Sequence, residues 1–582
     1  MIRDRLRLLR LLPAAGGGTA AVLVLLQLLQ ALVPTAMAWA VGRLVTALTA
    51  GQPPLPPILL VVALLLAGQV GWLLLEPTNA YAARRVDGVI RTRVRAVAAA
   101  LPGLDVLESP AFQDRAARAV DPGMGVARER SAGNAVTGQV TLIFRMVSAL
   151  TAAALLATFS PLLAVALLTV SLAVRAVLRR QWMAIIDRLD ADTAGQRYEF
   201  YVATQAVMGA AKDVRLFGLS DFFGGRFRAA AVRTYGPVWR SLLSVLRRQW
   251  WVGAVVTLCA AAALGFPAVA VLRGGLGPGD LIMVVLAGVG VLSISQMGLE
   301  AYDIEYGLRG LHAAGELAAL SPPAARPAPA EPARHAPEVC FTDVVFTYPG
   351  GDRPVLAGLS LTLRPGQTVA IVGENGAGKT TLVKLLAGLY APDSGTVTVD
   401  GSGPRVRRPP VTVLFQDFVR YPASVRDNVT AAVPPPHDDA AVRDALVRAG
   451  ASGLPGDLDA SLWNEGADGT DLSGGQWQRV ALARALYAAG RGRRLLVLDE
   501  PTANLDVHAE AAFHEQVVAG VRDTTTVLIS HRLATVRTAD RIILLRDGRV
   551  AEDGTHDELL AYGGDYARFF TTQAAAFHGG AR

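Results

Sequence analysis

The chain is 582 residues long and 52% hydrophobic, with only 18% charged residues and a net charge of +7. Soluble domains carry about 25% charged residues, and a chain this apolar does not stay unfolded in water, so intrinsic disorder is excluded. The net charge alone would favour a nucleic acid or an anionic membrane as the partner. The charge is unevenly distributed, however. Residues 1–320 hold 30 Lys and Arg against 19 Asp and Glu, whereas residues 321–582 carry a net charge of −4.

Six apolar stretches in the first half are each long enough to cross a bilayer, which takes about 20 residues. They lie at 11–42, 56–75, 137–159, 161–177, 250–272 and 281–299. Arginines cluster before the first stretch and after the second and fourth, on what becomes one side of the membrane. Because Lys and Arg accumulate in cytoplasmic loops, we predict a six-span domain over residues 1–320 with both termini in the cytoplasm.

A few polar side chains fall within or beside the predicted spans. Such residues either line a substrate path or hold helices together, and packing is the more frequent use. The candidates are Gln27, Gln30, Gln69, Glu76 and Gln296. Arg145, early in the third span, is expected to extend to the membrane interface.

The long polar segments 76–136 and 178–249 predict extensions of the membrane helices into the cytoplasm. Two short pieces within them, Glu108–Asp114 and Ala211–Phe217, are interpreted either as solvated turns or as docking elements for the second half of the chain.

A proline-dense segment from Ser321 to Pro337 separates the two halves. Proline at this density favours an extended, semi-rigid tether. We therefore predict a linker over 321–338 and a separate domain over 339–582.

The second half contains a phosphate-binding loop between a strand-like segment and a helix-like one. Its glycines allow successive backbone N–H groups to face phosphates, and the helix N-terminus adds its dipole. Lys379 is expected to contact the β- and γ-phosphates and Thr380 to bind Mg²⁺. The predicted nucleotide-binding residues are Gly373, Glu374, Asn375, Gly376, Ala377, Gly378, Lys379, Thr380 and Thr381.

An apolar run ending in two acids, Leu495–Glu500, predicts a buried strand. At its end, Asp499 is placed to bind Mg²⁺ and Glu500 to polarise an attacking water.

Between these motifs lies Leu472–Gln476, a Ser-Gly-Gly helix start that is typical of a second anion site. One nucleotide needs only one such loop, so the simplest interpretation is that the second one serves the nucleotide of another copy. The residues concerned are Ser473, Gly474, Gly475 and Gln476.

These three motifs in this order resemble the ATPase domain of ATP-binding cassette (ABC) proteins, and the whole chain resembles an ABC half-transporter of the exporter type. The resemblance implies a six-span α-helical transmembrane domain followed by an α/β P-loop NTPase cassette that binds ATP and Mg²⁺. It also implies roles for three further residues. Tyr348 would stack on adenine, Gln416 would contact Mg²⁺ and water, and His531 would act as a catalytic switch beside Glu500.

The resemblance further identifies regions near 108–114 and 205–217 as coupling helices that dock on the cassettes, and Asn504–Asp506 as a loop crossing between cassettes. The segment before Leu472–Gln476, the family's signature motif, fits the acidic cross-talk loop of the family poorly. Glu465 is the candidate for the acidic residue of that loop. With both Glu500 and His531 present, a homodimer with two working sites is permitted, although an intact half can also pair with a different half.

The expected function is ATP-driven export of an amphipathic peptide, drug or lipid by alternating access in the cell membrane. The segments 415–429 and 469–486 resemble ABC exporters of modified antimicrobial peptides. The alternative is an exporter-type protein that imports, for example, siderophores. A cytosolic ABC ATPase acting on ribosomes or DNA would have no spans, so no nucleic-acid partner is expected.

Overall fold

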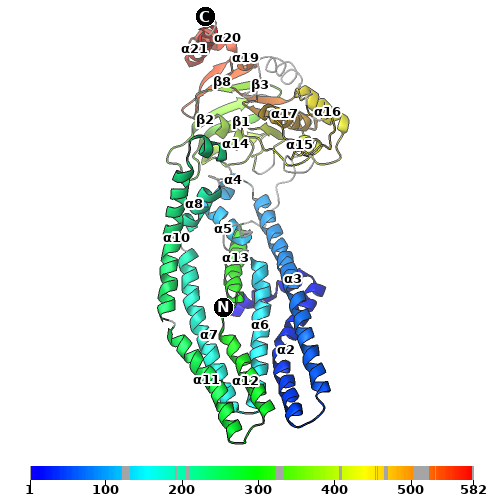
Figure 1. Ribbon diagram of the computed structural model, residues 1–582. Coiled ribbons are helices and arrows are strands. Elements are labelled where there is room, and N and C mark those ends of the chain that lie inside the picture. Colours follow the sequence, from blue (N-terminus) through cyan, green and yellow to red (C-terminus); the bar gives the residue numbers. More distant parts are fainter. Residues whose placement is uncertain are drawn as a thin grey trace. The chain divides into compact units, whose positions relative to one another are not determined.

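The computed structural model describes residues 2–579 except 102, 121–130, 191–192, 205–209, 249, 321–331, 406–408, 452–453, 455, 464–468, 502–522 and 531. The chain forms two compact units (Figure 1). The first comprises Met1–Val97 and Gln113–Leu320, and the second comprises Ala98–Phe112 and Ser321–Arg582.

The first unit is helical throughout its described part. Its α-helices are α1 (Ile2–Leu9), α2 (Gly17–Thr49), α3 (Leu55–Ala100), α5 (Pro110–Val120), α6 (Ala132–Ala157), α7 (Pro161–Asp190), α8 (Thr193–Thr204), α9 (Ala211–Leu216), α10 (Ser220–Arg248), α11 (Trp250–Leu272), α12 (Pro278–Leu292) and α13 (Glu300–Leu320). Short 3₁₀ turns, η1 (Leu12–Ala15) and η3 (Ser293–Ser295), precede α2 and follow α12.

Six helical segments among the described residues are long and apolar enough to cross a membrane, which confirms the six predicted spans. They are Gly17–Thr49, Leu55–Ala100, Ala132–Ala157, Pro161–Ile185, Trp250–Leu272 and Pro278–Leu320. In Leu55–Ala100 only 6% of the most apolar window is buried. A helix with this many exposed apolar side chains needs a lipid or protein covering, so the chain is a multi-pass membrane protein.

Small residues allow a close approach of α12 to α2 in this unit. At Gly279 in α12, a Cβ atom would lie 2.1 Å from the Thr46 Oγ1 atom and 2.4 Å from the carbonyl oxygen of Gly42, both in α2. Small residues let membrane helices pack with their backbones nearly in contact. Gln27 and Gln30 also hold helices together, because their amides donate to Thr141 Oγ1 and to the Gly68 carbonyl at 2.8 Å each.

The sixth span is broken between η3 and α13, and this break explains where Arg145 points. The Arg145 guanidinium donates to Glu300 Oε1 at 2.5 Å. It also donates to the carbonyl of Gln296 at 3.0 Å, and Arg175 donates to the same carbonyl at 2.8 Å and to Glu300 at 3.2 Å. The two arginines thus satisfy carbonyls that the interrupted helix leaves without partners.

Replacing Glu300 by Gln tests this cluster. Glu300 and Arg175 are both under 10% exposed as side chains. Removing the carboxylate leaves buried positive charge unpaired, and breaking a buried pair in this way costs on the order of 3 kcal/mol. We expect a clearly lower Tm for the Glu300→Gln protein in detergent. The matched control is Glu316→Gln, whose pair with Arg115 is exposed and should change the Tm little. Equal Tm values for the two variants would contradict the prediction.

The second unit contains two sheets with helices packed around them (Figure 1). One is antiparallel, in the order β2 (Leu356–Leu363), β1 (Val339–Phe346), β4 (Ser394–Val399). The other runs β5 (Val411–Leu414), β6 (Leu495–Asp499), β7 (Thr525–Ile529), β3 (Thr368–Val372), β8 (Arg541–Arg546), β9 (Arg549–Gly554). Its first five strands are parallel and β9 is antiparallel to β8.

The helices of this unit are α4 (Leu104–Leu107), α14 (Lys379–Leu386), α15 (Val425–Thr430), α16 (Asp439–Arg448), α17 (Gly474–Gly490), α19 (Leu533–Val536), α20 (His556–Tyr562) and α21 (Asp565–Gly579). Every residue of β6 and of β7 is buried. Continuous burial is typical of parallel strands covered on both faces, so the α/β fold predicted for this half is confirmed.

Candidate functional site

The site lies where adjacent parallel strands end. Ile529, the last residue of β7, pairs with both Ile371 of β3 and Asp499 of β6, and β5 pairs with β6 on its far side. The loops that follow β3, β6 and β5 carry the phosphate-loop residues, Glu500 and Gln416, respectively. Ligands of open α/β sheets bind at the carboxyl ends of the strands, so the sheet order brings together motifs that are far apart in the sequence.

The phosphate loop depends on glycines at three positions. Gly373, Gly376 and Gly378 have φ values of 148°, 88° and 100°, a region that other residues rarely adopt. Gly373 also lies against β8, because a Cβ atom there would be 2.3 Å from the carbonyl oxygen of Leu545. A residue with a side chain at position 373 would therefore collide with the main chain of β8.

Lys379 folds back over the loop that precedes it. Its Nζ donates to the carbonyls of Gly373 and Glu374 at 2.8 and 2.9 Å. Burial lowers the pKa of the ammonium, while the nearby Glu500 and Asp499 carboxylates oppose this shift. The Lys379 charge thus sits beside the loop where phosphates would add their negative charge.

Thr380 and Asp499 form the candidate Mg²⁺ site. The Thr380 hydroxyl donates to Asp499 Oδ2 at 3.1 Å, and Asp499 is 3% exposed. Burial raises the pKa of Asp499, the Thr380 hydrogen bond lowers it, and the Glu500 carboxylate raises it further. A hydroxyl and a carboxylate in contact are the hard oxygen donors that Mg²⁺ prefers, so these two residues fit the ion.

Glu500 and Gln416 meet across the ends of β6 and β5. The Gln416 amide donates to Glu500 Oε2 at 3.1 Å. The main chain of Glu500 has a positive φ of 51°, and its N–H donates to the Ile529 carbonyl at 2.9 Å. The carboxylate therefore projects from a tight turn directly after the buried Asp499.

Tyr348 lies beside the first turn of α14. Its hydroxyl is 3.0 Å from Thr381 Oγ1, and its ring packs edge to face against Phe346 and Tyr390. The ammonium of Lys384 lies 5.1 Å from the ring centroid. The Tyr348 side chain therefore lies beside Thr381 at the end of the phosphate loop.

The signature residues begin α17. The Ser473 hydroxyl accepts from the N–H of Gln476, and the Gln476 side chain accepts from the N–H of Ser473, which forms a capping box. Ser473 and Gly474 are exposed, and Gly475 and Gln476 are half-buried. Among the described contacts, Ser473 and Gln476 bond to each other rather than to the phosphate loop of the same chain.

Several expected residues lie outside the described part of the chain. They are the switch candidate His531, the crossing loop 504–506, the cross-talk candidate Glu465 and part of the second coupling region, 205–209.

A short segment from the first half of the chain packs within the second unit. The N–H of Leu104 donates to the Leu389 carbonyl and Arg405 pairs with Asp105, both at 2.7 Å. The Tyr390 hydroxyl hydrogen-bonds Glu108. Burial and this hydrogen bond raise the pKa of Tyr390, so the phenol remains the donor. These contacts involve residues 104–108, which lie directly before the docking element expected near 108–114 and share Glu108 with it.

The segment after Gln416 is held by polar contacts that the sequence did not reveal. Asn428 is fully buried, and its side chain bonds the backbone of Tyr421 in both directions. Arg484 of α17 donates to the Asn428 carbonyl at 2.7 Å and lies over the Tyr421 ring. Asn and Arg are common residues and no motif links Asn428 to Arg484 in the sequence. Only the folded structure shows that the two side chains meet.

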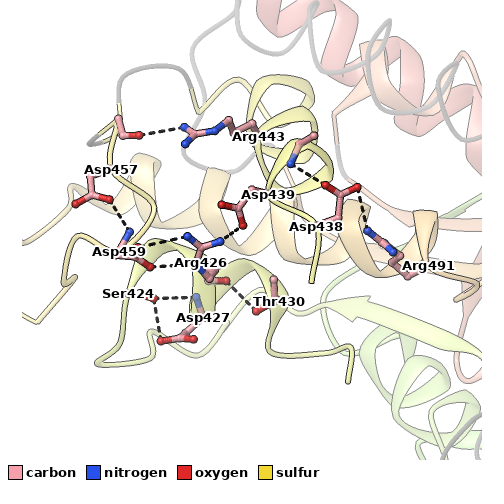
Figure 2. A network of polar contacts seen from close by, with 12 residues as sticks. Ser424, Arg426, Asp427, Thr430, Asp438, Asp439, Arg443, Asp457, Asp459 and Arg491 are labelled. Carbon is pink, nitrogen blue, oxygen red and sulfur yellow. Dashed lines mark hydrogen bonds and ion pairs between the residues drawn. The ribbon is translucent and has the colours of Figure 1, made fainter. Parts of the chain in front are cut away.

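Figure 2 shows how α15 and α16 are tied to neighbouring loops. Arg426 pairs with Asp439 and, at 3.0 Å, with Asp459. Arg491, just past the end of α17, pairs with Asp438 at 3.4 Å. Surface ion pairs thereby connect α15 and α16 to each other, to the loop at Asp459 and to the end of α17.

Two glycine substitutions distinguish the cost of a positive φ angle from the cost of a steric collision with β8. Gly373→Ala and Gly376→Ala both place a side chain at positive φ, which costs on the order of 1 kcal/mol. Only Gly373→Ala also collides with β8, since Gly376 has open space around its Cβ position. We expect Gly373→Ala to lower the Tm of the nucleotide-free protein more than Gly376→Ala does. The same Tm for both would show that the contact with Leu545 is unimportant.

Known proteins provide an independent comparison. The model of the ABC transporter family matches residues 356–503. The mycobactin import ATP-binding/permease protein IrtB of Mycolicibacterium thermoresistibile is 46% identical over 249 residues, 41% of this chain and 42% of that protein. The ATP-dependent lipid A-core flippase of Chromobacterium violaceum is 34% identical over 335 residues, 55% of each chain. The matches thus span about half the length of these curated relatives, or less.

Structural similarity extends over almost the whole chain. A bacterial Atm1-family ABC exporter solved with ATP bound superposes with a TM-score of 0.76 at 25% identity, covering 96% of this chain and 99% of that one. The second unit is therefore an ABC-type P-loop cassette. The chain as a whole has the Atm1-type exporter fold, in which one six-span domain is fused to one cassette.

Proposed function

We propose that this chain hydrolyses ATP as part of a dimer and uses closure of two cassettes to move a substrate across a membrane. The observation that carries the proposal is the divided site. The phosphate loop, Asp499 and Glu500 converge at the ends of neighbouring strands, whereas the signature residues cap α17 and bond to one another. A second copy would supply the missing signature to each nucleotide.

The chain's own residues have distinct parts in this chemistry. Lys379 and the loop N–H groups would bind the phosphates, and Tyr348 would stack on the base. Thr380, Asp499 and Gln416 would hold Mg²⁺, which when bound offsets the phosphate charge. Glu500 would accept a proton from the attacking water, with Gln416 orienting its carboxylate. His531 is proposed to contact the terminal phosphate.

The partner is proposed to be a second copy of this chain. Both Glu500 and His531 are present, so each of two identical sites would be complete. A different half-transporter remains the alternative partner. The contacts of Leu104, Asp105 and Glu108 within the cassette unit support a coupling role for this segment.

We further propose that the spans lie in the cell membrane with the termini and the cassette in the cytoplasm. Arginines cluster before the first span and after the second and fourth, as the positive-inside rule requires for this topology. The cassette would then face the cytoplasmic ATP pool.

Export of an amphipathic peptide, drug or lipid is the main proposal for the direction of transport, supported by the exporter fold and by the similarity to a lipid A-core flippase. Import is a second candidate, because a relative 46% identical over 249 residues is named a mycobactin importer.

Reconstituted vesicles decide between these directions. ATP added outside reaches only molecules whose cassettes face outward, so an exporter would accumulate substrate in the vesicle lumen and an importer would release preloaded substrate. Amphipathic peptides and ferric siderophores would first be screened for stimulation of ATP hydrolysis. If the wild-type protein has no ATPase activity in lipid, the proposed function is wrong.

The substitution Glu500→Gln tests the proposed general base. Loss of the base should lower ATP turnover by about 10²-fold to 10⁴-fold while ATP still binds, so the closed dimer should retain nucleotide through gel filtration. The control Glu338→Gln alters an exposed carboxylate just before β1 and should keep wild-type turnover. Full turnover by Glu500→Gln would remove Glu500 from the catalytic role.

A further inference from the structure

The main chain of Glu500 adopts a conformation that its local sequence disfavours. Its φ of 51° is left-handed, which costs a non-glycine residue on the order of 1 kcal/mol. The next residue is Pro501, and a residue before proline prefers an extended backbone. Such conformations persist only where the surrounding structure holds them.

Hydrogen bonds from two directions hold the turn. On the sheet side, the Glu500 N–H donates to the Ile529 carbonyl at 2.9 Å. On the helix side, the Gln478 amide Nε2 donates to the carbonyl of Glu500 at 3.3 Å and to that of Pro501 at 2.7 Å. Gln478 is 4% exposed, so if its amide were lost, water would have poor access to replace these bonds.

Gln478 belongs to α17, the helix that the signature residues begin. It lies four residues after Gly474, which corresponds to about 6 Å along the helix. Between them, Trp477 is 3% exposed, and the following turns are buried in the cassette core. The start of α17 and Gln478 are therefore parts of one continuous helix that is packed into the cassette core.

We propose that Gln478 is a positioning residue that holds the Glu500 turn and thereby ties the catalytic carboxylate to the signature helix of the same cassette. This inference rests on the proposed ATPase function. The Gln478 amide donates to the main-chain carbonyls of Glu500 and Pro501, so its influence on the reaction would pass through the Glu500 turn. A nucleotide held against Ser473 by the partner would press on the same helix that holds Glu500, which links one ATP site to the other.

The decisive variant is Gln478→Met, which keeps the size of the side chain and removes the donor. A small displacement of a catalytic group lowers turnover by up to about 10²-fold, so we expect kcat for ATP to fall at least about 10-fold. The Kd for ATP should stay within about two-fold, because Gln478 is not part of the phosphate loop. The matched control Gln367→Met, at the amino end of β3, should keep wild-type kcat.

The same substitution in the Glu500→Gln background separates positioning from a general structural role. If Gln478 acts through Glu500, the double variant should hydrolyse ATP at the residual rate of Glu500→Gln, within about two-fold. A further 10-fold loss, a weaker Kd for ATP, or wild-type kcat in Gln478→Met would each overturn the proposal. An inactive wild-type protein would instead overturn the proposed function on which it rests.

Discussion

Both units are shaped by the requirement that backbone N–H and C=O groups find partners where water is absent. In the membrane unit, helices meet this requirement within each segment, which is why apolar stretches such as Leu55–Ala100 are continuous helices. In the cassette, the buried strands β3, β6 and β7 meet it by pairing with one another. The same requirement produces long independent helices in one unit and a closely connected sheet in the other.

Where regular structure stops, side chains complete the hydrogen bonding. The break in the sixth span frees carbonyls that Arg145 and Arg175 satisfy, and Glu300 balances part of their charge. In the cassette, Gln478 does the same at the left-handed turn of Glu500. In both places a polar side chain is buried because the main chain nearby departs from helix or strand.

The sheet order explains how a site divided along the sequence becomes one place. The phosphate loop and the Asp499–Glu500 pair are more than 100 residues apart, yet β7 lies directly between β3 and β6 and pairs with both. The signature residues are carried by a helix and not by a strand end, and they bond to each other. The fold thus brings the phosphate loop together with Asp499 and Glu500 within one chain, and it leaves Ser473 and Gly474 of the signature exposed.

The sequence alone determined the spans, the α/β character of the cassette and the residues of the phosphate loop and of the strand ending in Asp499. These features depend on local patterns of apolar residues, glycines and charges, which are readable without knowing which segments meet. Three sets of contacts were not predictable in this way: the pairing of Arg145, the docking contacts of 104–108, and the hydrogen bond from Arg484 to the Asn428 carbonyl. Each joins common residue types from distant parts of the chain, with 155 positions separating Arg145 from Glu300. Only the tertiary structure decided these contacts, because a buried polar group takes its partner from whatever the packing brings within hydrogen-bond distance.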